Sequence, residues 1–171
     1  FKGPGTDLKV GLADDHEWMG GASMSQNGII CNPNIPSEEV FTTPHALRVE
    51  GHVSSTKPLS HQGTLIDDIR VVFEEGSITE ARASKGEAVL KKVLASDEGA
   101  RRLGEVALVP NSSPISSSGL LFYNTLFDEN AACHIALGQC YSKCFKGEKN
   151  LSTSEIKDRG GNSSMIHIDW M

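Results

Sequence analysis

The chain of 171 residues has the length of one good-sized domain and enough surface to bury a core. Its 16 Lys and Arg against 22 Asp and Glu give a net charge of −6, which argues against a nucleic-acid partner. The sequence has no apolar run of about 18 residues, the length needed to span a membrane, so we expect no membrane segment and a cytoplasmic location.

The first half of the chain alternates apolar and polar residues in several short segments, which is typical of half-buried strands. Prolines interrupt this pattern between residues 33 and 44 and favour a loop or a sheet edge there. Glu74-Glu75-Gly76-Ser77 has the composition of a hairpin turn. The predicted strands are 7–12, 47–55, 69–73 and 78–83.

The second half begins with a helical pattern, because Val89, Leu90, Val93 and Leu94 share one helix face. We then expect a strand at 105–109, a loop at 111–119, partly helical apolar segments at 120–127 and 131–144, a loop at 146–164, and a strand at 165–170. Together, these expected elements predict a mixed α+β fold with more strand than helix.

The two chain ends and the cysteines give further expectations. Phe1 stands where an initiator Met would be, and Met171 follows an apolar segment directly, so we expect 1–171 to be part of a longer chain. Cys140 and Cys144, with His134 upstream, leave a zinc knot open as an alternative. Free thiols in a reducing compartment are the favoured interpretation of all four cysteines.

Acidic and histidine residues stand at the borders of several apolar segments. On a strand, His167 and Asp169 would point to the same face and could bind a metal or simply hydrogen-bond to each other. The segment 128–134 contains Glu129 and His134, whose alternative role is an ordinary helix start with a core histidine. Glu105 opens an apolar strand and Glu39 lies in a proline-bounded turn, positions that are common without function.

Taken together, two histidines and several carboxylates are the donor inventory of a dinuclear metallohydrolase. Such sites hold two ions about 3.5–4 Å apart and activate a water molecule between them. The sequence has no phosphate-binding loop, no Gly-x-Ser-x-Gly and no His-Glu-x-x-His that would favour another chemistry. The joint pattern therefore favours a two-metal hydrolase.

Four ordered segments resemble the signatures of the metallo-aminopeptidases of the aminopeptidase T and aminopeptidase S (PepS, leucyl aminopeptidase) type. The resemblance covers essentially the whole chain and implies that 1–171 is the metal-binding catalytic domain of a longer two-domain chain, without the family's N-terminal α/β domain and extreme C-terminus. The similar segments are 34–42 with 48–51, 104–109, 126–138 and 167–169.

The resemblance also implies roles for individual residues. The implied metal ligands are Glu39, Glu105, Glu129, His134, His167 and Asp169, with Glu105 as the bridge between two divalent ions. The ions would be zinc, cobalt, manganese or magnesium. Tyr141 would assist catalysis by donating to the oxyanion, unless it is a buried tyrosine with a satisfied hydroxyl.

The implied activity is hydrolysis of the first peptide bond of peptides with a free N-terminus, with broad specificity, by a homodimer. Glu39 or Glu38 would accept the proton of the attacking water. His45 could line the site, whereas His52 and His61 are expected at the surface. The alternatives are a non-catalytic metal-binding fragment and a hydrolase of non-peptide amides.

Overall fold

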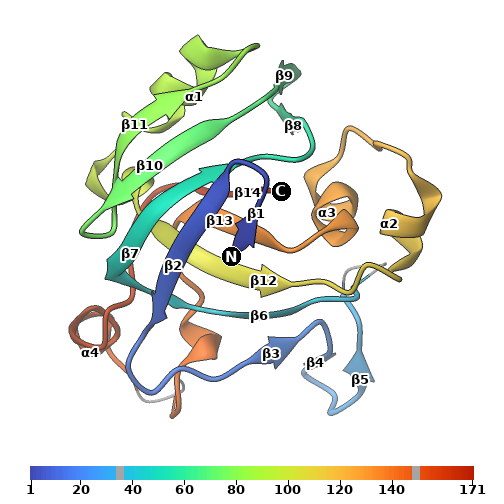
Figure 1. Ribbon diagram of the computed structural model, residues 1–171. Helices are drawn as coiled ribbons and strands as arrows, with labels where there is room; N and C mark the ends of the chain where they lie inside the picture. The colour runs from blue at the N-terminus through green and yellow to red at the C-terminus, as the bar shows by residue number, and fades with distance from the viewer. Residues whose placement is uncertain (34–36, 148–150) are drawn as a thin grey trace.

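The computed structural model describes residues 1–33, 37–147 and 151–171, and its main elements are two five-stranded antiparallel sheets (Figure 1). The first sheet has the order β1-β2-β7-β10-β11. Its strands are β1 (Lys2–Gly3), β2 (Thr6–Leu12), β7 (Pro44–Ser54), β10 (Arg70–Glu74) and β11 (Ser77–Arg82).

The second sheet has the order β14-β13-β12-β6-β3 and carries the candidate site. The chain passes from one sheet to the other at Thr43, between the end of β6 and the start of β7. The strands of this sheet are β3 (Met19–Gly20), β6 (Val40–Thr42), β12 (Leu103–Leu108), β13 (His134–Gly138) and β14 (His167–Trp170).

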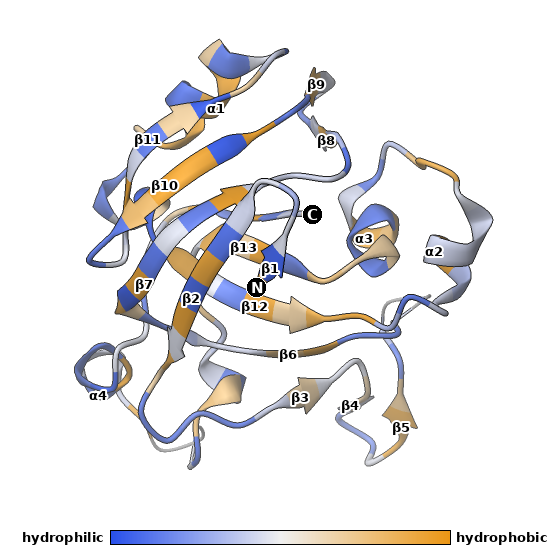
Figure 2. Ribbon diagram, in the orientation of Figure 1, coloured by the Kyte–Doolittle hydropathy of each residue, from blue (hydrophilic) through white to orange (hydrophobic). Residues whose placement is uncertain are grey.

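The main hydrophobic core combines residues of both sheets, which is why their strands alternate apolar and polar positions (Figure 2). Val49 and Phe73 contribute from the first sheet, and Leu137, Ile168 and Trp170 contribute from the second. All five are buried. The other face of the second sheet is therefore free to carry polar side chains.

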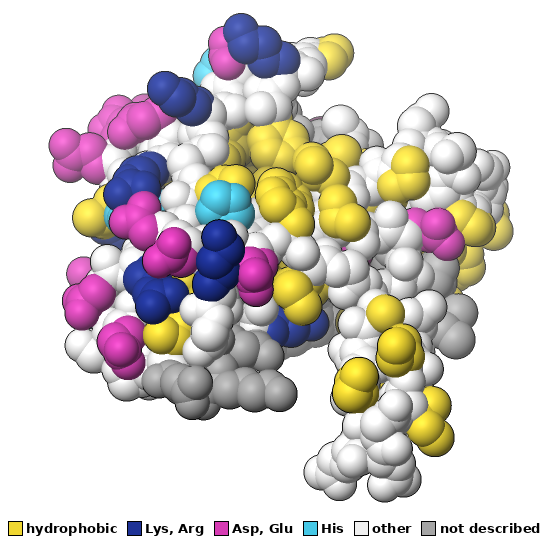
Figure 3. All heavy atoms as spheres, turned by 90° about the horizontal axis from the view of Figure 1, so that it is seen from below, with side chains coloured by type: hydrophobic (Ala, Val, Ile, Leu, Met, Phe, Trp, Pro, Cys, Tyr) yellow, Lys and Arg dark blue, Asp and Glu magenta, His cyan; other side chains and the backbone are white. Residues whose placement is uncertain are grey.

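Shorter elements surround the sheets, and none of the helices in the described ranges is long and apolar enough to cross a membrane. Figure 3 shows one face, where basic and acidic side chains are intermixed along one side. The hairpin strands are β4 (Ser23–Met24), β5 (Ile30–Cys31), β8 (Leu59–His61) and β9 (Thr64–Ile66). The helices are α1 (Glu87–Val93), α2 (Pro114–Ser118), α3 (Thr125–Asp128) and α4 (Thr153–Asp158), with 3₁₀ turns η1 (Glu98–Arg101), η2 (Glu129–Ala131) and η3 (Ser142–Cys144).

The structure confirms the strand-rich α+β class and the predicted strands and helix of the region 47–94. Three expectations for the second half of the chain are wrong. The segment 131–144 contains strand β13 rather than helix, because its buried residues pair in register with β12 and β14. The segment 146–164 contains α4, which begins with a capping box between Ser152 and Glu155.

The predicted loop 111–119 also contains a short helix. The Ser113 side chain caps α2 by accepting a hydrogen bond from the backbone N–H of Ser116. Pro114 occupies the first turn, where a backbone N–H would have no partner within the helix. The prediction missed this helix because serine and proline are as common in loops as at helix starts. The expected loop or sheet edge between residues 33 and 44 lies partly outside the described residues, and its later part contains β6, an inner strand that pairs with both β12 and β3.

Candidate metal centre

The register of the second sheet brings two carboxylates to one face. Residues directly opposite each other in an antiparallel pair point to the same face. Glu105 of β12 is paired with Ala136 of β13, and Ala136 is paired in turn with Asp169 of β14. One row across three strands therefore carries two carboxylates with a small, fully buried alanine between them.

The two-residue alternation of the strands adds both histidines to this face. His134 precedes Ala136 by two residues, and His167 precedes Asp169 by two residues, so both imidazoles point to the side of the carboxylates. The apolar residues between them, Ile135 and Ile168, belong to the hydrophobic core on the opposite face.

Strand β6 and the residue before it complete the arrangement. Phe41 is paired with Ala107, which lies two residues after Glu105 and therefore on the same face. Glu39 lies two residues before Phe41 and lines the same pocket. We call the five side chains gathered here the donor cluster: Glu39, Glu105, His134, His167 and Asp169.

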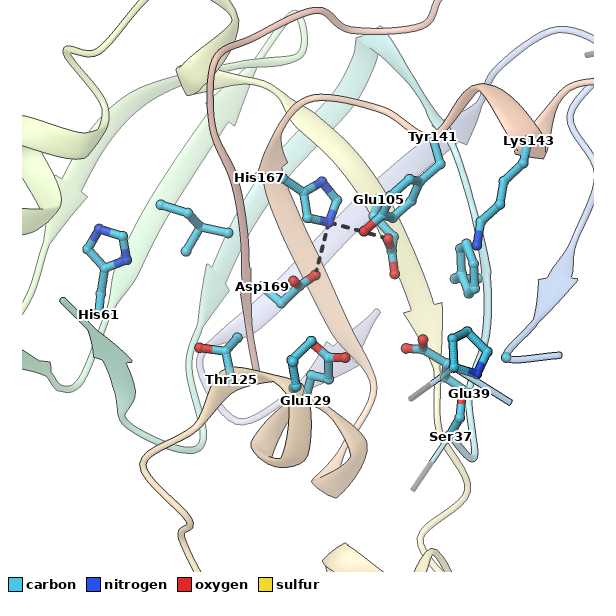
Figure 4. A pocket seen from close by; sticks show the side chains of 15 residues that line it. Ser37, Glu39, His61, Glu105, Thr125, Glu129, Tyr141, Lys143, His167 and Asp169 are labelled. Carbon is cyan, nitrogen blue, oxygen red and sulfur yellow. Dashed lines mark ion pairs between the residues drawn. The ribbon is translucent and has the colours of Figure 1, made fainter. Parts of the chain in front are cut away.

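The donor cluster divides into two groups that share Glu105. Figure 4 shows the group of Glu105, His167 and Asp169. His134 Nε2 lies 3.1 Å from Glu39 Oε2 and 3.7 Å from Glu105 Oε1. His167 Nε2 lies 3.5 Å from Glu105 Oε2 and 3.6 Å from Asp169 Oδ1. Each oxygen of Glu105 thus faces a different group.

Backbone carbonyls orient both imidazoles. His134 Nδ1 lies 3.1 Å from the carbonyl oxygen of Ala132, and His167 Nδ1 lies 2.7 Å from that of Gln139. A carbonyl can only accept, so we assign a proton to each Nδ1. The neutral form of each ring then presents the lone pair of Nε2 to the carboxylates, as in metal-bound histidines.

The donor cluster fits a divalent cation. Glu39 Oε2, His134 Nε2 and His167 Nε2 are buried and have no hydrogen-bond partner among the described residues. Ligand atoms about 2.1 Å from a tetrahedral ion lie about 3.4 Å from one another. The separations of 3.1–3.7 Å match this spacing, so each group can hold an ion without large rearrangement.

Without a metal, the histidines and carboxylates shift one another's protonation. Burial disfavours the charged form of His134 and His167, but the adjacent carboxylates outweigh burial and raise the pKa values to about 11 and about 10. Burial would raise the pKa of Glu105, but the two imidazoles outweigh it and lower the pKa. The metal-free cluster therefore holds protons that a cation has to displace.

Glu129 and Tyr141 line the same pocket, which has a volume of about 360 Å³, but belong to neither donor group. Burial, together with the charges of Asp169 and Glu39, raises the pKa of Glu129 to about 8. The Tyr141 ring lies 4.7 Å from the ring of His167, and the residue is 39% exposed. Tyr141 is thus not the buried tyrosine of the alternative interpretation.

The structure places the remaining candidates elsewhere, with one exception. Glu38 is exposed and does not line the pocket, and His45 lines a different cavity beside Gly160. His61, which was expected at the surface, lines the candidate site from hairpin β8–β9. The expectation that His45 lines the site is therefore wrong, and the half-buried His61 is a pocket residue that the sequence did not indicate.

Two polar residues that sequence reasoning missed support the pocket wall. The buried Asn130 accepts a hydrogen bond at Oδ1 from the backbone N–H of Glu38 at 3.0 Å and donates from Nδ2 to the Leu126 carbonyl. Gln139 supplies the carbonyl that orients His167. Only their position after folding, and no local pattern, identifies them.

The cysteines lie apart from the donor cluster. All four are free thiols, and no cysteine belongs to a candidate metal group within residues 1–33, 37–147 and 151–171. Cys140 and Cys144 are buried in two different apolar clusters. Burial raises their pKa values to about 11 and about 12, which favours the neutral thiol over the thiolate that zinc binds. The zinc-knot alternative is not supported.

Comparison with known proteins agrees with this chemistry. The profile of the family described as "Thermophilic metalloprotease (M29)" matches residues 1–171. The chain belongs to this family. It is 57% identical over 171 residues to Aminopeptidase T of Thermus thermophilus and 51% identical to Aminopeptidase 2 of Geobacillus stearothermophilus.

The match to these relatives covers 100% of this chain and 41% of each of them. The solved structure of wild-type AmpT from Thermus thermophilus superposes with a TM-score of 0.92 at 56% identity, over 99% of this chain and 42% of that chain. The M29 portion described here thus has the same fold as the corresponding part of that protein.

Proposed function

We propose that the protein is a metal-dependent aminopeptidase and that the donor cluster holds two divalent ions with Glu105 between them. The observation that carries this proposal is the pair of donor groups that share the two oxygens of Glu105. Membership of the M29 metalloprotease family and the aminopeptidase names of its relatives support it.

Bound divalent ions would polarise the scissile carbonyl as Lewis acids and lower the pKa of a water molecule, so that hydroxide is available as the nucleophile near neutral pH. Histidine nitrogens and carboxylate oxygens suit zinc, cobalt and manganese, and the carboxylates also suit magnesium. Glu39, Glu105, His134, His167 and Asp169 would hold the ions.

The other groups of the pocket would handle substrate and protons. Glu39 is better placed than the exposed Glu38 to accept the proton of the attacking water, because only Glu39 lines the pocket. Glu129 lies outside both donor groups and would pair with the substrate's α-ammonium, which accounts for cleavage at a free N-terminus. Tyr141 would donate its hydroxyl proton in a hydrogen bond to the developing oxyanion.

Hydrolysis of aminoacyl-p-nitroanilides by the complete natural protein tests this proposal. The metal-stripped enzyme should be inactive and should regain activity with zinc, cobalt, manganese or magnesium. Acetylation of the substrate's amine should abolish cleavage. Failure of every metal to restore turnover would refute the proposal, and cleavage of the acetylated substrate would indicate an amidase instead.

A further inference from the structure

The acidic pocket contains one lysine among its lining residues, Lys143 of η3. Its Nζ lies 4.7 Å from the centroid of the Phe41 ring and 5.2 Å from that of Tyr141. Within the described residues no carboxylate lies within ion-pair distance of this ammonium. The charge is thus held against two aromatic faces, which leaves N–H donors for another group.

The Tyr141 ring limits the distance between this ammonium and the donor cluster. The Tyr141 ring that Lys143 contacts lies in turn 4.7 Å from the ring of His167. Phe41 projects from the same sheet face as the donors. These two steps, 5.2 Å and 4.7 Å, place the ammonium at most about 10 Å from the His167 ring, a range that includes the roughly 7 Å that an extended dipeptide spans.

The two ends of the pocket carry different basic side chains. Figure 4 shows Lys143 at one end of the pocket and His61 at the other, with Glu105, Glu129 and Asp169 between them. When the α-ammonium of a short peptide lies among the carboxylates of the pocket, its C-terminal carboxylate is best bound by a cation further along the pocket. The ammonium of Lys143 supplies three N–H donors at one end of the pocket, whereas His61 lies at the opposite end.

We propose that Lys143 binds the C-terminal carboxylate of a dipeptide and gives the enzyme a preference for dipeptides over longer peptides. This inference rests on the proposed aminopeptidase function. A third residue would extend the chain by about 3.4 Å and carry the carboxylate past the ammonium. If Lys143 served only to offset the acidic charge of the pocket, substrates with and without a terminal carboxylate would be affected equally.

The test compares a dipeptide that has a free carboxylate with the same dipeptide as its C-terminal amide, using the complete natural protein loaded with metal. A charge-assisted hydrogen bond corresponds to roughly a 10-fold or larger preference in kcat/KM for the free acid. Lys143→Gln should bring the ratio of kcat/KM for the free acid to kcat/KM for the amide close to one, mainly by raising KM for the free acid. Lys143→Arg should keep most of the preference, because it retains the charge.

Two control variants make the test specific. Lys146→Gln removes an exposed lysine just after η3 that does not line the pocket, and it should leave the ratio unchanged. His61→Gln should also leave the ratio unchanged. If His61→Gln abolishes the preference and Lys143→Gln does not, the carboxylate binds at the opposite end and the inference is wrong.

The remaining outcomes are also decisive. A wild-type enzyme that cleaves both substrates equally well, or a ratio that survives Lys143→Gln, overturns the role of Lys143 but leaves the aminopeptidase proposal intact. A metal-loaded wild type that cleaves neither dipeptides nor aminoacyl-p-nitroanilides overturns both.

Discussion

Substitution of Glu105 by Gln tests whether one carboxylate serves both donor groups. The two oxygens of Glu105 face different histidines, 3.7 Å from His134 and 3.5 Å from His167. Glutamine keeps one oxygen and replaces the other with an NH₂ group, which cannot bind a cation. The variant should therefore lose one ion and bind the other more weakly.

The size of the effect follows from the contacts removed. A contact between a carboxylate and a charged partner contributes about 1.5–3 kcal/mol, which is roughly a 10- to 150-fold change in affinity. The ion that keeps the amide oxygen should bind about 10- to 100-fold more weakly, because the ligand loses its negative charge. The ion that faces the NH₂ group should not bind at micromolar metal concentrations.

Isothermal titration calorimetry and elemental analysis of the dialysed protein measure these effects. Glu80→Gln, on the exposed side of β11 in the other sheet, is the matched control and should bind two ions like the wild type. Asp169→Asn should weaken only the group that contains His167. Two ions bound to Glu105→Gln with wild-type affinity would refute the shared-carboxylate arrangement.

Three further predictions concern the metal-free protein and the pocket wall. The raised pKa values of His134 (about 11) and His167 (about 10) stabilise the metal-free fold fully below the ordinary value of 6.5, and this stabilisation is lost as the pH rises toward 10. The melting temperature in EDTA should therefore fall between pH 6.5 and 10, and a constant value would contradict the pKa shifts. Asn130→Ala removes the acceptor for the N–H of Glu38 and should lower the free energy of unfolding by about 1–3 kcal/mol in urea titrations, while Asn130→Asp, which keeps the acceptor, should lose less. Ala136→Leu would fill the space between the carboxylates and should abolish metal binding, with native circular dichroism as the check on folding; full metal occupancy would show that Ala136 does not lie beneath the ions.

Local patterns were sufficient to predict the strand-rich fold and part of the candidate site. The alternation around Ile168 predicts that His167 and Asp169 share a face, and the structure confirms that they do, with 3.6 Å between Nε2 and Oδ1. The prediction succeeds because both residues lie on one strand, where a period of two fixes their relation.

The rest of the site depends on pairings between distant segments, which a single sequence does not reveal. His134 meets Glu105 because β12 and β13 pair in one register, and a shift by one residue would turn the histidine toward the core. The expected helix at 131–144 would have had no such register. His61 and Lys143 reach the pocket from a hairpin and a 3₁₀ turn, where no periodicity indicates a direction.

The two faces of the second sheet have different roles, one packing against the core and the other carrying the donor cluster. On β13 and β14, residues that support the core alternate with residues that project toward the donor cluster. Because core-facing and metal-facing side chains alternate along each strand, a substitution of similar size at a metal-facing position leaves the core-facing side chains in place. A different set of donor side chains could therefore be placed on the same sheet by substituting every second residue of β13 and β14.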